Sequence, residues 1–137
     1  MSEPENIAIV QQAYKNFQTG NIPALLAQLS DDVTWQLPEM LNVPFGGKRT
    51  TPAGVGEFFA LIAENEEPLR FEPREFVAQG EKVVSLGYYQ WRLKANGREF
   101  DGDFAHVFTI RDGKVVAFQE YTDTAACAAA YQKAMTA

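Results

Sequence analysis

Apolar residues near the start of the chain recur at helical intervals. The periodic positions are Ile7, Val10, Tyr14 and Phe17. They follow the segment Ser2-Glu3-Pro4-Glu5, which has the spacing of a capping box, and the pattern stops at Gly20. The pattern predicts a first amphipathic helix with one apolar side.

Two further helices are predicted before residue 68. Asn21 can cap a short second helix with Pro23 in its first turn, and Ser30-Asp31-Asp32 stops it. Its apolar residues are Leu25, Leu26 and Leu29. The pair Thr51-Pro52 begins a third helix, which ends in the polar segment 64–68. Its buried stripe is Val55, Phe58, Phe59 and Ile62.

Alternating apolar and polar residues predict five strands. One strand covers 33–37, between the second and third helices, and four more follow at roughly 70–78, 82–95, 98–110 and 114–122. The segment 38–50 is rich in Pro and Gly and is predicted to be a loop. Its apolar residues, Met40, Leu41, Val43 and Phe45, indicate that it packs against the rest of the molecule.

The pair Asn96-Gly97 is typical of a two-residue hairpin turn. Such a turn would set Tyr89 opposite Phe104 and Gly87 opposite His106. One face of the two strands then carries Ser85, Tyr89, Trp91, Phe100, Phe104 and Phe108, and we expect the helices to cover it. The other face carries Val84, Leu86, Tyr88, Ala105, Val107 and Ala117. This apolar outer face predicts a homodimer that packs sheet to sheet.

The last hairpin decides whether His106 and Glu120 lie on the same face. A two-residue Asp112-Gly113 turn would set His106 opposite Gln119 and send Glu120 to the outer face. A three-residue loop with a bulge at Gly113 would set Phe104 opposite Glu120, which makes Glu120 a diagonal neighbour of His106. The apolar pattern favours the three-residue loop, because it aligns Val116 with the aromatic face.

Composition and charge exclude several classes of function. The chain has 137 residues, 12 Lys and Arg against 18 Asp and Glu, and a net charge of -6, so neither nucleic acid nor an anionic membrane is an expected partner. No apolar run is long enough to span a membrane and the N-terminus lacks the pattern of a secretory signal, so we expect a cytoplasmic protein. The single cysteine, Cys127, and the single histidine argue against a disulfide and a metal site. No cofactor motif is present.

The order of these segments resembles the NTF2-like superfamily, which has a cystatin-like α+β fold, and more closely its SnoaL-like group, which includes polyketide cyclases. The similarity covers nearly the whole chain, in the segments AYKNFQTGNIPALLAQLSDDVTW, GVGEFFALI, VAQGEKVVSLGYY and HVFTIRDGKVVAFQEYTD. It implies one domain, 1–137, in which three N-terminal helices pack on a strongly curved antiparallel sheet. It also implies a homodimer and an apolar conical pocket closed by the helices. We expect the loop 38–50 to cover the mouth of this pocket and to set its specificity.

The resemblance implies roles for three polar residues. Glu120 falls where the SnoaL-like cyclases have an acid/base aspartate, and His106 falls on a pocket histidine. Tyr14 matches the oxyanion-holding tyrosine of the ketosteroid isomerases, whose catalytic aspartate is replaced here by Leu37. We therefore expect Glu120, His106 and Tyr14 to be catalytic. We expect the substrate to contact Phe17, Trp35, Leu37, Phe58, Phe59, Tyr89, Phe104, Phe108 and Phe118.

Three functional hypotheses remain open at this level. The first is a cofactor-independent enzyme of the isomerase, cyclase or aldol type, in which Glu120 moves a proton next to the carbonyl group of an apolar small molecule. The second is a noncatalytic binder or dimeric scaffold with the same pocket. In the third, side chains fill the cone completely. Separately from these hypotheses, His106 has a structural interpretation, as a histidine bonded to Tyr14, Tyr89 or water inside the cone, and Glu120 has one as a strand-end residue that reaches water.

Overall fold

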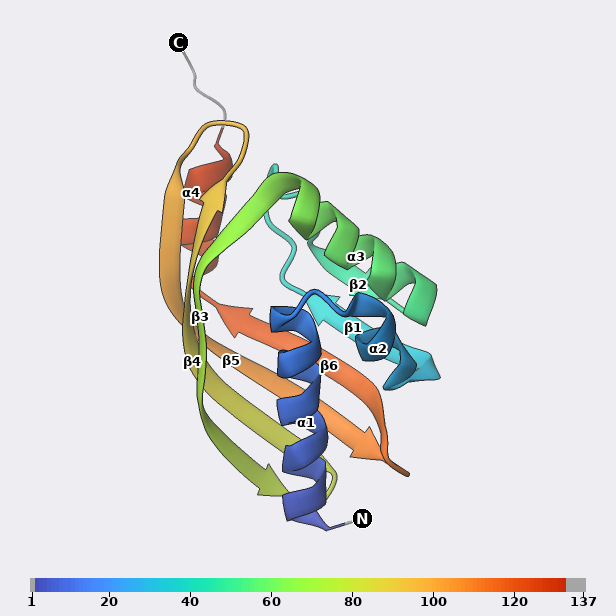
Figure 1. The fold of residues 1–137 in the computed structure, drawn as a ribbon. Coiled ribbons are helices and arrows are strands. Elements are labelled where there is room, and N and C mark those ends of the chain that lie inside the picture. The colour runs from blue at the N-terminus through green and yellow to red at the C-terminus, as the bar shows by residue number, and fades with distance from the viewer. Residues whose placement is uncertain (1, 133–137) are drawn as a thin grey trace.

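The computed structural model describes residues 2–132, and these form a curved sheet with helices along one side (Figure 1). The helices are α1 (Glu3–Gln18), α2 (Ile22–Ala27), α3 (Pro52–Asn65) and α4 (Thr124–Tyr131). The strands are β1 (Leu29–Leu37), β2 (Gly47–Arg49), β3 (Glu66–Gln79), β4 (Lys82–Leu93), β5 (Glu99–Arg111) and β6 (Lys114–Thr122).

The predicted caps begin the first three helices. Ser2 and Glu5 form the capping box of α1, and Asn21 accepts a hydrogen bond from the Ala24 backbone N–H at the start of α2. Thr51 caps α3 in the same way through the N–H of Gly54. All three predicted N-caps are therefore confirmed, and they determine the residue at which each helix begins.

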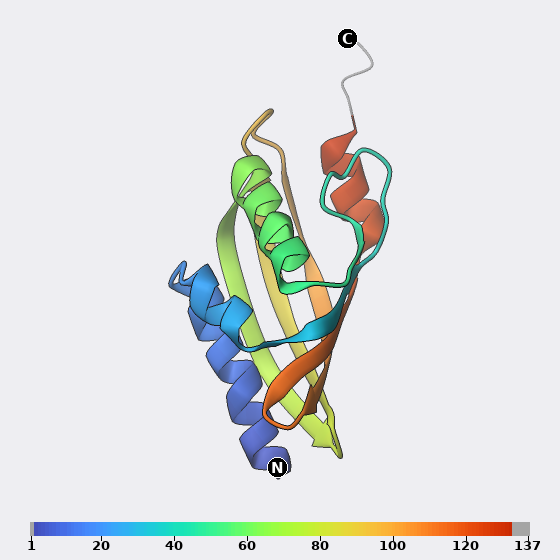
Figure 2. The same ribbon diagram turned by 90° about the vertical axis from the view of Figure 1, so that its right-hand side faces the viewer.

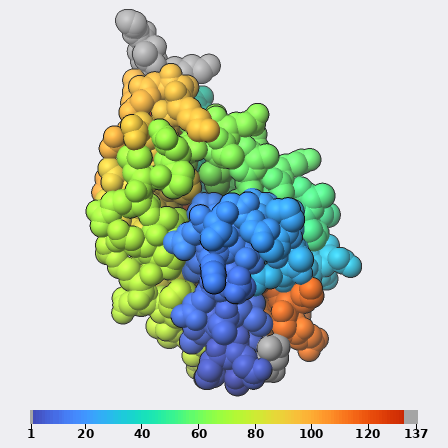
Figure 3. Space-filling model, viewed as in Figure 1, coloured from blue at the N-terminus to red at the C-terminus, as the bar shows by residue number. Residues whose placement is uncertain are grey.

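The six strands form a single sheet in the order β2-β1-β6-β5-β4-β3. All neighbours are antiparallel except β1 and β6, which pair in parallel, with Trp35 beside Phe118. Helices α1, α2 and α3 lie over the inner face of this sheet (Figures 1 and 2). In the space-filling view these helices close over most of that side of the molecule (Figure 3). The predicted α+β cone is confirmed, with one parallel pair in the sheet.

The β4–β5 hairpin has a longer turn than Asn96-Gly97 predicts. Leu93 and Arg98 close a four-residue loop, 94–97, through a 2.8 Å backbone hydrogen bond. The register therefore shifts by two positions, and Ser85, not Gly87, pairs with His106. A shift of two keeps every side chain on its face, so the predicted aromatic face is nevertheless the buried one.

The β5–β6 hairpin combines features of the two expected turns. Asp112 and Gly113, with φ of 53° and 77°, form a two-residue turn of the type that hairpins favour, so the predicted three-residue loop is wrong. A bulge at Val116 then shifts the register by one residue between Ile110 and Thr109. The bulge places Glu120 directly opposite His106 on the inner face.

Two elements have no counterpart in the sequence prediction. Strand β2 lies within the predicted loop 38–50, and α4 follows β6. The two regions lie next to each other at one end of the cone (Figure 2), where the rings of Phe45 and Tyr131 are 5.9 Å apart. The loop therefore covers this end together with α4.

Among residues 2–132, no helix combines the length and the apolar composition needed to cross a bilayer.

Candidate functional site

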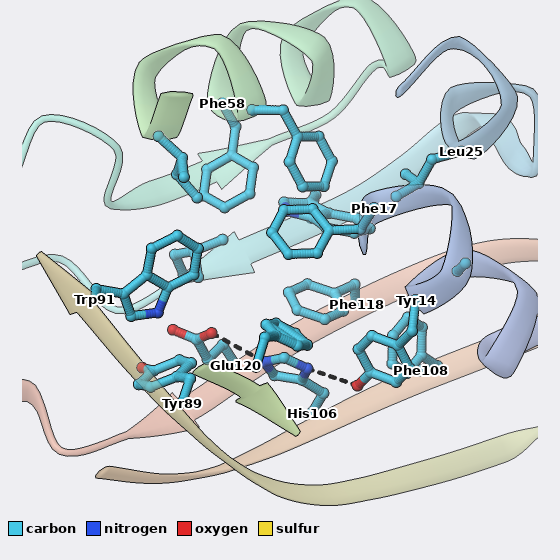
Figure 4. Close-up of a pocket in the computed structure, with 16 residues that line it drawn as sticks. Tyr14, Phe17, Leu25, Phe58, Tyr89, Trp91, His106, Phe108, Phe118 and Glu120 are labelled. Atoms are coloured by element: carbon cyan, nitrogen blue, oxygen red, sulfur yellow. Dashed lines mark hydrogen bonds and ion pairs between the residues drawn. The ribbon is translucent and has the colours of Figure 1, made fainter. Parts of the chain in front are cut away.

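A chain of hydrogen bonds joins three polar side chains on the inner face of the sheet. The Tyr14 hydroxyl oxygen lies 2.7 Å from His106 Nδ1, and His106 Nε2 lies 2.9 Å from Glu120 Oε2 (Figure 4). Because His106 and Glu120 pair directly across β5 and β6, the strand register sets their separation. Tyr14 reaches them from α1. One helix and two strands therefore hold the three groups, which we call the polar relay.

Packing fixes the plane of the imidazole ring. His106 is 4% exposed, and the Phe104 ring stacks against it with centroids 4.2 Å apart. Ser85 lies opposite His106 and is fully buried, so a small side chain fills the position where the imidazole needs room. Gly87 has the corresponding role for Phe104, because a Cβ at Gly87 would lie 2.5 Å from the Phe104 ring. The histidine can therefore keep one orientation toward both partners.

Two proton arrangements fit the polar relay. In one, a neutral imidazole donates from Nε2 to Glu120 and accepts the Tyr14 hydroxyl proton at Nδ1. In the other, an imidazolium donates to both partners and leaves the Tyr14 hydroxyl proton free for a ligand. The second arrangement carries one proton more than the first. The relay can therefore take up a proton without a change in the positions of its heavy atoms.

The phenol of Tyr14 stays protonated in this environment. Burial raises the pKa of Tyr14 well above its usual value, and the Glu120 carboxylate adds to this effect. Burial likewise raises the pKa of Tyr89, whose hydroxyl donates to Thr122 Oγ1 at 2.6 Å. Both phenols therefore act as hydrogen-bond donors and not as phenolates.

The polar relay borders a largely apolar cavity of about 70 Å³, which we call the inner cavity. A single water molecule needs roughly 10–15 Å³ by this kind of measure, so the space can hold several non-hydrogen atoms. Tyr14, His106 and Glu120 contribute the polar atoms at one part of its wall (Figure 4). A cone completely filled by side chains is therefore wrong for this chain.

Most of the residues expected to contact substrate lie on the wall of the inner cavity. They are Phe17, Trp35, Leu37, Phe58, Phe59, Tyr89, Phe108 and Phe118. Phe104 does not border the cavity, because its ring lies between His106 and the glycine gap at Gly87. We therefore assign Phe104 to support of the histidine and not to ligand contact.

The structure adds wall residues that were not among the predicted contacts. Trp91 was expected only as part of the covered face and Leu25 only as part of a helix, but both line the inner cavity, as does Phe71 of β3. Phe71 lies 5.0 Å from Phe17, ring to ring. The sequence placed Trp91 on the covered face, Leu25 in a helix and Phe71 within a strand, and it gave no signal that separates cavity wall from filled core.

A second chamber adjoins the inner cavity toward α4 and the loop 38–50. Its volume is about 40 Å³, and its own wall includes Met40, Phe45, Glu66, Phe100, Thr122 and Cys127. The Glu66 carboxyl group accepts a hydrogen bond from the Tyr131 hydroxyl of α4. Burial, with a smaller contribution from the charge of Glu120, raises the pKa of Glu66 to about 7. The sequence predicts that the polar segment 64–68 ends a helix, and nothing in it distinguishes Glu66 from its neighbours.

Within the described part of the chain, no group of three or more His, Cys, Asp or Glu side chains lies close enough together to hold a metal ion. The polar relay itself offers a carboxyl group, an imidazole and a phenol in a largely apolar enclosure.

The curved sheet and its helices enclose an apolar cavity with a glutamate–histidine pair on its wall, and the fold is of the NTF2-like type. The sequence matches the family model of the SnoaL-like domain over residues 10–118. The chain belongs to the SnoaL-like family. The matched range includes Tyr14 and His106 and ends just before Glu120.

Solved structures agree with this family assignment. An NTF2-like protein from Burkholderia xenovorans is 34% identical, with a TM-score of 0.87, and the match covers 96% of this chain and 99% of that one. TerC, which was co-crystallised with polyporic acid, is 30% identical, with a TM-score of 0.81 over 94% of this chain and 99% of its own. A candidate polyketide cyclase from Xanthomonas campestris is 20% identical, with a TM-score of 0.78 over 95% and 98% of the two chains, and shares the fold. No curated protein sequence matches the chain.

Proposed function

We propose that the protein binds an apolar carbonyl compound in the inner cavity and moves a proton at the carbon next to the carbonyl group. The observation that carries this proposal is the hydrogen-bonded chain Tyr14–His106–Glu120 at the wall of an otherwise apolar cavity. Such a cavity suits an apolar ligand with few oxygen atoms. The similarity to TerC and to a candidate polyketide cyclase supports a small organic ligand.

The polar relay suits proton removal from carbon. Glu120 accepts the hydrogen bond of His106 through Oε2, and it borders the cavity, so its carboxylate can act as the base. In the arrangement with an imidazolium, His106 donates to Glu120 and to the Tyr14 oxygen, and the Tyr14 hydroxyl proton is free for the carbonyl oxygen of the substrate. When the C–H bond breaks, its electron pair stays on the substrate as an enolate and the proton moves to the Glu120 carboxylate. The Tyr14 hydroxyl then stabilises the enolate oxygen, where negative charge develops.

The captured proton can then complete either of two reactions. Returned to a different carbon of the enolate, it gives an isomerisation. If the enolate carbon instead attacks a second carbonyl group of the same molecule, a ring closes and the resulting alkoxide takes the proton. Both outcomes conserve atoms and need no cofactor, and the choice between them depends on the substrate.

Deuterium exchange into α-tetralone, an apolar bicyclic ketone, tests the proton-transfer step. In deuterated water the wild-type protein should speed incorporation of deuterium at the carbon next to the carbonyl, as followed by NMR. Glu120→Gln should lower this rate by about 100-fold or more, because a positioned base contributes at least that factor. Glu64→Gln, an exposed change on α3, is the matched control and should exchange at the wild-type rate.

Two results would count against the assignment. Exchange at the wild-type rate in Glu120→Gln would remove Glu120 from the chemistry. Binding of α-tetralone by the wild type with no exchange above the solvent rate would favour the alternative function, a noncatalytic ligand-binding or scaffold protein in which the relay only orients the ligand.

A further inference from the structure

A second buried carboxyl group lies apart from the polar relay. Glu66 is 3% exposed and stands where α3 ends and β3 begins. Among residues 2–132 its hydrogen-bond partner is Tyr131, and none of the ion pairs in that range includes it. Enclosing a carboxyl group with so little compensation costs stability relative to an apolar side chain of similar size. Core packing therefore gives no reason for a glutamate at this position.

The position of Glu66 relative to the two spaces suggests a reason. The inner cavity and the second chamber share six wall residues, Leu37, Phe58, Ile62, Tyr89, Trp91 and Glu120. Glu66 borders only the second chamber, whereas Glu120 borders both. A ligand that extends from the inner cavity into the second chamber would therefore pass Glu120 and then meet Glu66.

Neither space is large, and their shared walls consist mainly of aromatic and aliphatic side chains. Their volumes are about 70 and 40 Å³, so a ligand of more than one ring needs both. The second chamber is also bordered by the loop 38–50 and by α4, through Phe45 and Cys127. These elements have no role in positioning the polar relay. Glu66, at the start of β3, supplies the acidic group on the wall of this chamber, and Tyr131 of α4 donates a hydrogen bond to it.

We propose that Glu66, held by Tyr131, is a second oxygen-binding subsite, and that the ligand is an apolar molecule with a carbonyl, enol or hydroxyl oxygen at each end. This inference rests on the proposed function in one respect, because it assumes that the first oxygen lies at the polar relay. A carboxyl group with a pKa near 7 is present in both forms at neutral pH. The neutral form donates to a carbonyl oxygen, and the ionised form accepts from an enol or phenol hydroxyl.

Matched phenols with one and two hydroxyl groups test the subsite. The pairs are phenol with hydroquinone, and para-phenylphenol with para,para′-biphenol, and their dissociation constants are measured by calorimetry. In the wild type, the dihydroxy member of at least one pair should bind about tenfold more tightly, as one further buried hydrogen bond allows. Glu66→Leu should abolish this preference while the affinity for the monohydroxy member stays within about twofold. Glu66→Gln should retain part of it, because an amide still donates and accepts.

The controls separate this proposal from the proposed function. Glu64→Leu, on the exposed side of α3, should keep the full preference. Glu120→Gln should weaken the binding of both members of each pair and leave the ratio of their dissociation constants unchanged, since Glu120 lies at the opposite end of the ligand from Glu66. Monohydroxy binding with no dihydroxy preference in the wild type, or a preference that survives Glu66→Leu, overturns the second subsite alone. Failure of every phenol to bind while α-tetralone still exchanges overturns the second subsite alone, whereas failure of the phenols to bind together with no enzymatic exchange into α-tetralone overturns both proposals.

Discussion

Glu66 differs from the other acidic residues of the chain in how it should couple folding to pH. Its pKa is raised from the ordinary 4.5 to about 7, because burial disfavours the charged form. The folded protein therefore binds this proton more tightly than the unfolded chain does. The stabilising contribution is complete below pH 4.5 and is lost as pH rises toward 7. Besides burial, Tyr131 of α4 and Glu120 of β6 act on the pKa of Glu66, and the charge of Glu66 in turn adds to the rise that burial causes in the pKa of Cys127 and of Tyr89.

We predict that Glu66→Gln removes this pH dependence. From pH 4.5 to pH 8 the wild type should lose free energy of unfolding relative to the variant, on the order of 3 kcal/mol for a pKa shift of this size. Urea unfolding at both pH values measures the difference. Glu64→Gln, whose side chain is exposed, should follow the wild type. Parallel pH profiles for wild type and Glu66→Gln would mean that Glu66 titrates normally.

At the scale of elements, the sequence predicted which side chains share a face better than which residues pair. The capping signals at Ser2, Asn21 and Thr51 act locally, and all three predicted helix starts are confirmed. Both hairpin registers were wrong. The actual β4–β5 register differs from the predicted one by two residues. At β5–β6 the two-residue turn alone would send Glu120 to the outer face, and the bulge returns it to the inner face. The predicted assignment of side chains to the inner and outer faces is nevertheless correct, because the alternation of apolar residues constrains the pairing of strands more strongly than turn length does.

Elements without a local signal were missed for a different reason. The parallel β1–β6 pair and the contact of α4 with the loop 38–50 join segments that are far apart along the chain. Their stability comes from tertiary packing, which no local pattern encodes. Glu66 was missed for the same reason, because its hydrogen-bond partner Tyr131 lies on α4, 65 residues further along the chain. His106 and Glu120, by contrast, lie on adjacent strands of one hairpin, and strand alternation was sufficient to bring them to one face.

Gly87 provides a test of how β4 supports the polar relay. A Cβ at this position would lie 2.5 Å from the Glu72 carbonyl oxygen and 2.5 Å from the Phe104 ring, and the backbone oxygen cannot rotate away. We predict that Gly87→Ala lowers the free energy of unfolding by about 1–3 kcal/mol, as overpacking does. It should also displace Phe104 and change the NMR shifts of the His106 ring that stacks on it.

Gly102 on β5 is the matched control for Gly87. Its Cβ would meet the Asp123 Cβ at an ordinary 3.5 Å, so Gly102→Ala should stay within about 0.5 kcal/mol of the wild type in chemical unfolding. If the two alanine variants proved equally stable, the tight contact between β3, β4 and Phe104 would not limit this part of the fold.

At the scale of the whole molecule, the outer face of the sheet has no helix over it (Figure 1). Leu86, Ala105 and Tyr121 lie side by side across β4, β5 and β6, and Leu86 and Tyr121 are 38% and 53% exposed. Val77 of β3 adds a further apolar side chain at 58% exposure. We propose that a second copy of the chain covers this face, because a sheet face that repeats on an identical partner can pack symmetrically on itself.

A charge at Ala105, the middle residue of the row Leu86–Ala105–Tyr121, should separate the two copies. Ala105→Glu places carboxylates from both copies near the middle of the contact, where their desolvation and mutual repulsion oppose association. We predict that the wild type sediments as a dimer at micromolar concentration and that Ala105→Glu sediments as a monomer with an unchanged circular dichroism spectrum. Leu41→Glu introduces the same charge at a residue that is 83% exposed in the loop 38–50, and it should remain dimeric. A monomeric wild type, or a dimeric Ala105→Glu variant, would show that the outer face is not the contact. Because the inner cavity and the second chamber lie on the opposite side of the sheet, the monomeric variant should still bind the phenol probes with wild-type affinity.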